Sequence, residues 1–270
     1  MKSIDIYGFG NGIVDILLEV NDAEFEQLQT EKATMRLVSE EEQKNLLSQF
    51  SDRTLHLVSG GSVANSVILA SQLGAKCAFA TSLGDDRYGL HYKGEFDSLG
   101  IDLGNPLAAG GVTGTSAIII TPDAERTMRT CLGISAKFDR SHVDKDVIRH
   151  SQWIFIEGYL LSNSEETFDA LLFGVQEAKN AHTRIALTVS ESWIVDGFRD
   201  RLDQLAPSVD LIFCNETEGR SLAGANASDA QSAFTILKGL FPNVVVTCGE
   251  KGVLVSYGGE VTAVNAFPCE

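Results

Sequence analysis

Two polar stretches in the first third of the chain combine glycine with side chains that suit a small hydroxylated ligand. The first, GFGNG at residues 8–12, contains Asn11 and precedes Asp15, which lies in the apolar run IVDILLEV. An ionised carboxylate among apolar neighbours is costly without a partner, and it accepts hydrogen bonds from two hydroxyl groups at once. We predict that Asn11 and Asp15 bind a polyol; the alternative is that Asp15 faces solvent on the polar side of a strand.

The second stretch, SGGSVANSVILASQLG at residues 59–74, turns through Gly60 and Gly61 into an expected helix that contains Asn65. A glycine turn before a helix is a common anion site, but a P-loop needs Gly-Lys-Ser/Thr where this chain has VAN. An amide both donates and accepts hydrogen bonds, which suits neutral hydroxyl groups better than a phosphate. We therefore predict that this turn and Asn65 share the ligand of Asp15.

Residues 8–12 also resemble part of a dinucleotide fingerprint, which would indicate an oxidoreductase. The third glycine position holds Ile13, however, and the residues after it predict a strand rather than a helix. We regard this as the weaker alternative, beside a simple tight turn.

Two groups in the second half suit a nucleotide. Asn215 and Glu218 lie three residues apart at the start of an expected helix, where they can position Mg²⁺ through its waters. Acidic residues in a first helical turn are also favoured by the helix dipole alone, so a structural role stays open. Thr247, Gly249 and Gly252 lie in VVVTCGEKGVLV, a strand-turn-strand whose small residues either admit a flat group or only form a tight turn.

The surrounding elements must bring these residues together. From residue 152, apolar runs of strand length (WIFIEGY, RIALTVS, DLIFC, NVVVTCG) alternate with helical patterns such as VDGFRDRLDQL. This alternation predicts an α/β fold with a mostly parallel sheet covered by helices, and the carboxyl ends of its strands meet at one edge. SIDIYGFG predicts another buried strand, and Ser39 begins a capping box before a further helix. IVDILLEV, TSAIIITP and RTMRTCL are strand-like without following helices, which predicts a small β-sheet lid from about residues 13–38 and 105–131.

The composition narrows the function further. The formal net charge is −16 without a basic stripe, which disfavours nucleic acid or an anionic membrane as partner. The sequence shows neither a membrane-spanning segment nor a signal-peptide pattern, so we expect a cytoplasmic protein. The histidines lack metal-binding spacing, so any metal is expected on oxygen ligands. The cysteines are odd in number and widely spaced, which predicts buried free thiols at Cys77, Cys131, Cys214, Cys248 and Cys269.

Eight motifs in order resemble the ribokinase-like, or PfkB-type, carbohydrate kinases, most closely their bacterial adenosine-kinase-like branch. They are GNGIVD, SGGSVANSVILASQLG, LGDDRYG followed by SLGID, TGTSAIIITPDAERTM, IEGYL, ALTVSESW, NETE and VVVTCGEKGVLV. The resemblance implies one kinase domain over residues 1–270, a three-layer α/β/α fold with the β-lid inserted in it. It also implies transfer of the γ-phosphoryl group of ATP, with Mg²⁺, to a primary hydroxyl of a nucleoside or sugar.

The resemblance also assigns roles to residues. It implies that the sugar or ribose is held by Asn11, Asp15, Gly60, Gly61 and Asn65, that Arg126 reaches over the site from the lid, and that Tyr159 lines it. It places Asn215 and Glu218 near magnesium and phosphate, and Thr247, Gly249 and Gly252 in the nucleotide-binding turn.

The family's Asp-Thr-x-Gly-Ala-Gly-Asp motif, which carries the catalytic base, is absent from this sequence. We therefore expect the base to lie beyond Glu270 and these 270 residues alone to be nearly inert. The alternative is a nucleoside- or sugar-binding protein without catalysis. We expect a monomer or a homodimer that pairs through the lid.

Overall fold

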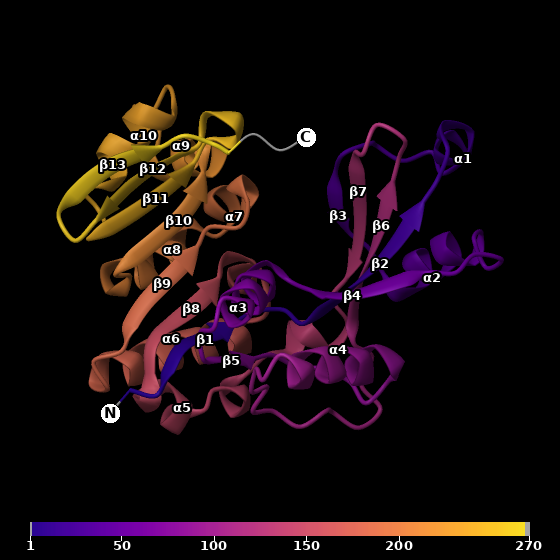
Figure 1. Ribbon diagram of the computed structural model, residues 1–270, viewed down its shortest axis with the longest axis horizontal. Helices are drawn as coiled ribbons and strands as arrows, with labels where there is room; N and C mark the ends of the chain where they lie inside the picture. Colours follow the sequence, from indigo (N-terminus) through magenta and orange to yellow (C-terminus); the bar gives the residue numbers. More distant parts are fainter. Residues whose placement is uncertain (1, 268–270) are drawn as a thin grey trace.

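The computed structural model describes residues 2–267, which form two β-sheets joined by short crossing segments (Figure 1). The large sheet has eight strands. In spatial order they are β13 (Glu260–Val264), β12 (Val253–Tyr257), β11 (Asn243–Thr247), β10 (Leu211–Asn215), β9 (Arg184–Thr188), β8 (Ser151–Glu157), β1 (Ile4–Phe9) and β5 (Cys77–Ala80).

The strands from β5 to β11 run parallel, and only β12 runs in the opposite direction, so that it pairs antiparallel with both β11 and β13. The predicted mostly parallel sheet is therefore confirmed. Alternate side chains of the central strands are fully buried on one face, for example Phe9 and Ile154. The carboxyl ends of these parallel strands lie along one edge of the sheet, which is where the sequence predicted the site.

Helices pack on both faces of the large sheet, which gives the expected three layers. One face is covered by α5 (Lys145–His150), α6 (Glu165–Asn180), α8 (Arg199–Leu205), α9 (Glu216–Ala223) and α10 (Ala230–Leu237). The other face carries α3 (Ser62–Gln72) and α4 (Arg87–Ser98), which pack over β1 and β5. Short 3₁₀ helices occupy Gly133–Lys137, Arg140–His142, Gly158–Ser162, Ala206–Ser208 and Gly249–Lys251.

The helical pattern VDGFRDRLDQL forms two helices instead of one, α7 (Ser192–Gly197) and α8. Phe198 separates them with a non-helical backbone (φ −130°, ψ 32°). Its ring packs edge-on against Trp193, with 6.4 Å between ring centroids. The break at Phe198 therefore divides a pattern that is continuous in the sequence.

The second sheet is the predicted lid. Its strands are, in spatial order, β3 (Met35–Leu37), β7 (Arg126–Cys131), β6 (Gly114–Ile120), β2 (Ile13–Glu19) and β4 (His56–Gly60). β4 lies outside the two ranges that the sequence indicated. α1 (Asp22–Gln27) and α2 (Glu40–Ser48) belong to this part of the chain, and α2 begins with the predicted capping box between Ser39 and Glu42. Figure 1 shows the lid standing beside the large sheet.

The cysteine prediction is confirmed where the structure describes it. Cys77, Cys131 and Cys214 are buried free thiols, and Cys248 is free but half-buried. Cys269 lies outside the described residues.

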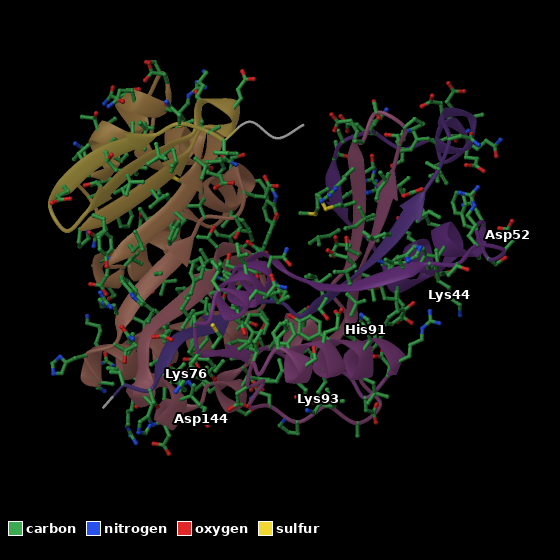
Figure 2. All side chains as sticks on the ribbon, viewed as in Figure 1. Lys44, Asp52, Lys76, His91, Lys93 and Asp144 are labelled. Atoms are coloured by element: carbon green, nitrogen blue, oxygen red, sulfur yellow. The ribbon has the colours of Figure 1, made fainter. Side chains whose placement is uncertain are left out.

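The surface of the described residues is rich in charge, with side chains such as Lys44, Lys93 and Asp144 extending into solvent (Figure 2). Within residues 2–267, no helix has the length and apolar character needed to cross a membrane.

Candidate functional site

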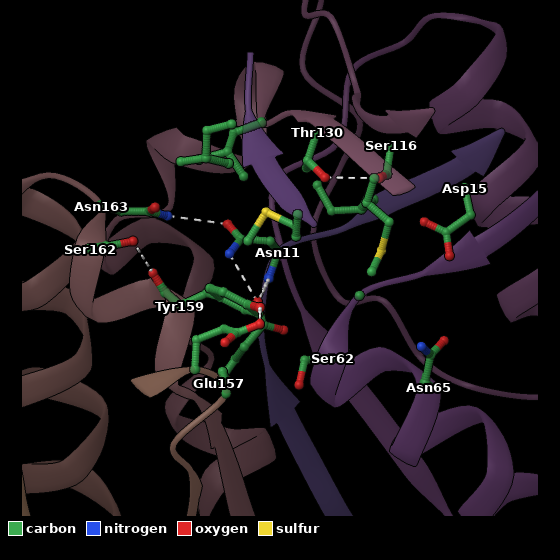
Figure 3. Close-up of a pocket in the computed structure, with 18 of the residues that line it drawn as sticks. Asn11, Asp15, Ser62, Asn65, Ser116, Thr130, Glu157, Tyr159, Ser162 and Asn163 are labelled. Carbon is green, nitrogen blue, oxygen red and sulfur yellow. Dashed lines mark hydrogen bonds between the residues drawn. The ribbon is translucent and has the colours of Figure 1, made fainter. Parts of the chain in front are cut away.

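A cavity of about 300 Å³ lies between the lid and the carboxyl ends of the large sheet (Figure 3). Strands of the lid contribute Ile13, Asp15, Met35, Leu37, Ser116 and Met128. The opposite wall comes from the ends of β1, β8 and β9 and from the start of α3, and it includes Asn11, Gly61, Asn65, Glu157, Tyr159 and Trp193. Five of the residues predicted to bind the acceptor therefore line one cavity: Asn11, Asp15, Gly61, Asn65 and Tyr159.

Asp15 projects from β2 on the cavity side of the lid. It is paired in register with Ser116 of β6, which in turn is paired with Thr130 of β7, so the three side chains share one face. The Asp15 carboxylate is half-buried and has no hydrogen bond or ion pair to any residue among 2–267. Burial raises its pKa to about 6, and the charge of Arg126 opposes this rise. A desolvated carboxylate without a protein partner is suited to accept hydrogen bonds from a ligand.

The glycine pair before α3 has two separate roles. Gly60 ends β4 opposite Ile13, and its carbonyl accepts a hydrogen bond from the hydroxyl of Tyr92 at 3.2 Å. Gly61 is the N-cap of α3 with φ +113°, a conformation that favours glycine. Gly61 lines the cavity, whereas Gly60 adjoins it through Asp15.

Asn65 lies in the first turns of α3 with an exposed side chain on the cavity wall. Its amide group has no hydrogen bond to another residue among 2–267, while its backbone N–H donates to the carbonyl of Gly61 at 2.9 Å. Asp15 and Asn65 are thus two unpartnered polar side chains that face one cavity from opposite walls (Figure 3).

Asn11 is more constrained than the sequence suggested. Its Nδ2 donates to Oε1 of Glu157 at 3.0 Å, and its Oδ1 accepts from Nδ2 of Asn163 at 3.2 Å. The amide orientation is therefore fixed from both sides, and one N–H of Nδ2 is left over for a ligand.

Glu157 was predicted to lie at the carboxyl end of a strand, on the edge where ligands gather, but no binding role was assigned to it. It is 1% exposed, and burial raises the pKa of its carboxyl group to about 7 despite hydrogen bonds from Val63 and Asn11. The available signal was a lone acidic residue at the end of the apolar run WIFIEGY, the same signal that marked Asp15.

The cavity lining also includes several large apolar and aromatic side chains. Met35, Leu37 and Met128 of the lid lie on one side. On the other side Tyr159 and Trp193 pack together with 6.0 Å between ring centroids. The hydroxyl of Tyr159 donates to Oε1 of Glu191 at 3.4 Å. Of the residues that form these two sides, only Tyr159 was predicted as a binding residue, because side chains from four separate elements meet here.

Arg126 does not line the cavity. It is the first residue of β7 and is exposed at the end of the lid away from the crossing segments, opposite Ile120. Only the effect of its charge on the pKa of Asp15 connects it with the site.

Asn215 and Glu218 form a complete capping box at the start of α9, directly after β10. The Asn215 side chain accepts from the N–H of Glu218 at 2.9 Å, and its Nδ2 donates to Glu218 Oε1 at 2.6 Å. Glu218 is 6% exposed, and burial first and the nearby charge of Glu191 second raise its pKa. The structural role that the sequence left open is therefore present, and the carboxylate still lacks an ion-pair partner among residues 2–267.

Thr247, Gly249 and Gly252 lie at the predicted strand-turn-strand between β11 and β12. Gly249 has φ +56°, and a Cβ atom added there meets no atom within 4 Å. A Cβ atom at Gly252 would lie 2.0 Å from the carbonyl oxygen of Val264, so the space beside this glycine is filled by the chain itself. Gly249 therefore borders open space, while Gly252 permits close backbone packing.

Comparison with known proteins decides the family. Residues 31–270 match the pfkB family of carbohydrate kinases. The chain belongs to this family.

Two relatives and two solved structures illustrate the likeness. The ribokinase of Haemophilus influenzae is 30% identical over 215 residues, which are 77% of this chain and 66% of the ribokinase. Adenosine kinase 2 of Arabidopsis thaliana is 22% identical over 282 residues, which cover 97% of this chain and 80% of that protein. The adenosine kinase structure from Sinorhizobium meliloti gives a TM-score of 0.90 at 28% identity, covering 100% of this chain and 82% of that one. A probable sugar kinase from Rhizobium etli CFN 42 gives 0.90 at 28% identity, covering 99% and 81%.

Kinases of the pfkB family use ATP, typically with Mg²⁺. Among residues 2–267 no three acidic, histidine or cysteine side chains are grouped to hold a metal ion. Mg²⁺ next to phosphates needs only one or two carboxylates and several waters. Glu191 and Glu218, which have no cationic partner among the described residues, fit that requirement.

Proposed function

We propose that this protein transfers the γ-phosphoryl group of ATP, with Mg²⁺, to a primary hydroxyl of a nucleoside or sugar. The observation that carries the proposal is the Asp15 carboxylate, which faces the cavity of a pfkB-family fold without a partner among the described residues. The free energy cost of desolvating this carboxylate is recovered only when a ligand donates hydrogen bonds to it. Hydroxyl groups of a sugar or ribose supply two such donors in the required proximity.

Each polar residue of the cavity has a distinct part in holding the acceptor. Asp15 accepts from two hydroxyl groups, and Asn65 donates to and accepts from the ligand across the cavity. Asn11 offers its one remaining N–H. Fixing the acceptor hydroxyl in this way lowers the barrier by orientation, which is the main contribution of the protein in phosphoryl transfer.

The apolar and aromatic side chains of the cavity favour a nucleoside over a free sugar. A pentose or hexose needs only the polar residues, whereas a flat base is suited to the space between Met35 and Met128 of the lid and the Tyr159–Trp193 pair. The base would be in contact with apolar atoms on two sides while the ribose faces Asp15. We therefore propose a nucleoside of the adenosine type as the preferred acceptor.

The nucleotide is proposed to lie along the ends of β10 and β11. Thr247 and the open turn at Gly249 border the nucleoside part of ATP, and Asn215 and Glu218 lie toward its phosphates. Gly252 supports this turn through its close backbone packing. When bound, Mg²⁺ neutralises charge on the phosphate oxygens. Arg126 is proposed to approach the acceptor when the lid closes, and we assign the proton acceptor to no residue of this chain.

The experiment measures binding and turnover on the protein as its gene encodes it. Isothermal titration calorimetry with adenosine, ribose and a hexose identifies the acceptor, and ADP release in a coupled assay measures transfer. We expect adenosine to bind at least ten-fold more tightly than ribose and to support ADP release. Absence of binding by every nucleoside and sugar, or binding without ADP release from any acceptor, would contradict the kinase proposal.

Asp15→Asn tests the observation that carries the proposal, because the amide has the same shape but accepts on one atom only. We expect it to weaken acceptor binding at least ten-fold. Asp123→Asn is the matched control, since Asp123 is an exposed lid carboxylate that pairs with Lys32 and does not line the cavity. Equal affinities of the two variants would exclude Asp15 from the site.

A further inference from the structure

The chain crosses between the large sheet and the lid at four places: between β1 and β2, between β4 and α3, before β6 and after β7. These crossings touch backbone to backbone. A Cβ atom added to Gly61 would lie 2.4 Å from the carbonyl oxygen of Asn11, and one added to Gly114 would lie 2.7 Å from that of Leu132. The crossings therefore lie close together. Any movement of the lid relative to the large sheet requires a change in the conformation of these segments.

Glu157, at the carboxyl end of β8, bonds the first crossing at Asn11 and the start of α3, where the second crossing ends. Its Oε1 accepts from the side chain of Asn11 at 3.0 Å and from the backbone N–H of Asn11 at 3.4 Å. Its Oε2 accepts from the backbone N–H of Val63 at 3.2 Å. A Cβ atom at Gly10 would lie 2.6 Å from Oε2, so the first crossing runs directly against the carboxylate. Figure 3 shows Glu157 beneath Asn11 at the base of the cavity.

Only a carboxylate makes this arrangement possible. Both of its oxygens accept, so one group satisfies N–H donors from two segments that are far apart in the sequence. Glu157 is 1% exposed, and it has no cationic partner within 4 Å among the described residues. Hydrogen bonds to a buried charge are worth more than neutral ones, so breaking one of these bonds has a large effect on the local structure.

We propose that Glu157 is a positioning residue that holds the lid at a fixed distance from the large sheet. The acceptor site depends on that distance, because Asp15 belongs to the lid and Asn65 belongs to α3 on the large sheet. By bonding both the crossing at Asn11 and the start of α3 at Val63, Glu157 fixes the position of the first crossing relative to the helix that carries Asn65. The inference rests on the proposed function only in taking the cavity as the acceptor site.

Glu157 also lines the cavity, so the competing explanation is a direct contact with the ligand. The two explanations differ in the ligand-free protein. A positioning role affects the crossings whether or not a ligand is bound, whereas a contact role affects only the complex.

The test is amide hydrogen exchange, followed by mass spectrometry with fragmentation, on ligand-free wild-type protein and Glu157→Gln. The side-chain amide of this variant has one acceptor and one donor group. In either orientation, therefore, the N–H groups of Asn11 or the N–H group of Val63 lose their acceptor. We expect exchange at Asn11 or Val63, or both, to become roughly ten-fold faster or more, with β10 and β11 unchanged. Acceptor affinity should fall by a similar factor, while affinity for ATP stays within about two-fold.

Glu191→Gln is the matched control, because Glu191 is another carboxylate of the cavity wall but touches neither crossing. Its ligand-free exchange at Asn11 and Val63 should equal that of the wild type. Unchanged exchange in Glu157→Gln together with weaker acceptor binding would overturn the proposal in favour of direct contact. Unchanged exchange with unchanged binding would overturn it as well.

A second variant keeps the proposal testable where Glu157→Gln does not fold. Asn163→Ala removes the bond to Oδ1 of Asn11 but leaves the bond between Glu157 and Val63. We expect faster exchange at Asn11 and no change at Val63. Exchange at Asn11 that stays equal to that of the wild type would contradict the positioning role of the bonds around Asn11. Because these measurements need neither ligand nor turnover, failure of the kinase proposal would appear separately, as absence of acceptor binding to the wild type.

Discussion

The carboxylate of Asp15 lies directly against Gly60: a Cβ atom added to Gly60 would be 2.6 Å from Oδ2 of Asp15. The absence of a side chain on β4 at this point leaves room for the carboxylate beside the adjacent strand β2. Gly60 therefore makes the position of the Asp15 carboxylate possible, although it does not line the cavity itself. The glycine pair was predicted to contact the ligand through its backbone. For Gly60, which does not line the cavity, the structure gives a different reason for glycine, the close approach of Asp15.

Gly60→Ala should displace the Asp15 carboxylate from its position in the cavity. We expect acceptor affinity to fall roughly ten-fold or more, because the new methyl group occupies the place of Oδ2 and misaligns the hydroxyl acceptor. Calorimetric titration with adenosine measures the change. Gly94→Ala on α4 is the control: a Cβ there meets no atom within 4 Å, so affinity should stay the same and stability should rise by about 1 kcal/mol.

Asp15→Asn should stabilise the fold at neutral and alkaline pH. Burial raises the folded-state pKa of Asp15 to about 6 from 3.8, so the folded protein binds this proton more tightly than the unfolded chain. Ionising the buried carboxyl group therefore lowers the free energy of unfolding. This loss is absent below pH 4, grows as the pH rises toward 6, and reaches its full size above pH 6. Removing the charge should therefore raise the free energy of unfolding at pH 8 by on the order of 1–3 kcal/mol.

Urea denaturation of the wild type and Asp15→Asn at pH 8 and at pH 4.5 measures this effect. The gain should be smaller at pH 4.5, where the wild-type carboxyl group is already protonated in the folded state. A gain of the same size at both pH values would show that the charge of Asp15 is not its cause.

Acceptor binding should release protons near pH 6. Ligand hydroxyl groups that donate to Asp15 favour its ionised form, so binding lowers a pKa that stands at about 6 in the free protein. Affinity should therefore decrease as the pH falls below 6. Calorimetry in two buffers with different ionisation enthalpies measures the number of protons released. Asp15→Asn should reduce the number of protons released by the contribution of Asp15. This comparison is needed because Glu157, whose pKa is about 7, titrates in the same range.

Asn215 can be tested for its two roles separately. Asn215→Ala removes the N-cap of α9 and should lower the free energy of unfolding by about 1 kcal/mol. Asn215→Asp keeps a capping oxygen but adds a negative charge beside the proposed phosphates. We expect a higher KM for ATP in this variant, together with some loss of stability, because the new carboxylate replaces the Nδ2 group that donates to Glu218. Equal KM values for the wild type and Asn215→Asp would leave Asn215 with its structural role alone.

The sequence determined the main elements because their signals are local. The alternation of apolar strands and amphipathic helices after residue 152 gave the parallel sheet, and three strand-like runs without helices gave the lid. The lone carboxylate in IVDILLEV singled out Asp15, since the cost of burying a charge can be inferred without coordinates. These signals, together with the eight motifs, were sufficient for the family.

Only the tertiary structure decided how distant segments meet. The bonds from Glu157 to Asn11 and Val63 join residues 146 and 94 positions apart, and no local pattern encodes such pairs. The distance of Arg126 from the cavity follows from its place at the end of β7, which depends on the register of the lid strands. Hydrophobic periodicity specifies which face of an element is buried, but the packing of elements against one another specifies which side chains share a cavity.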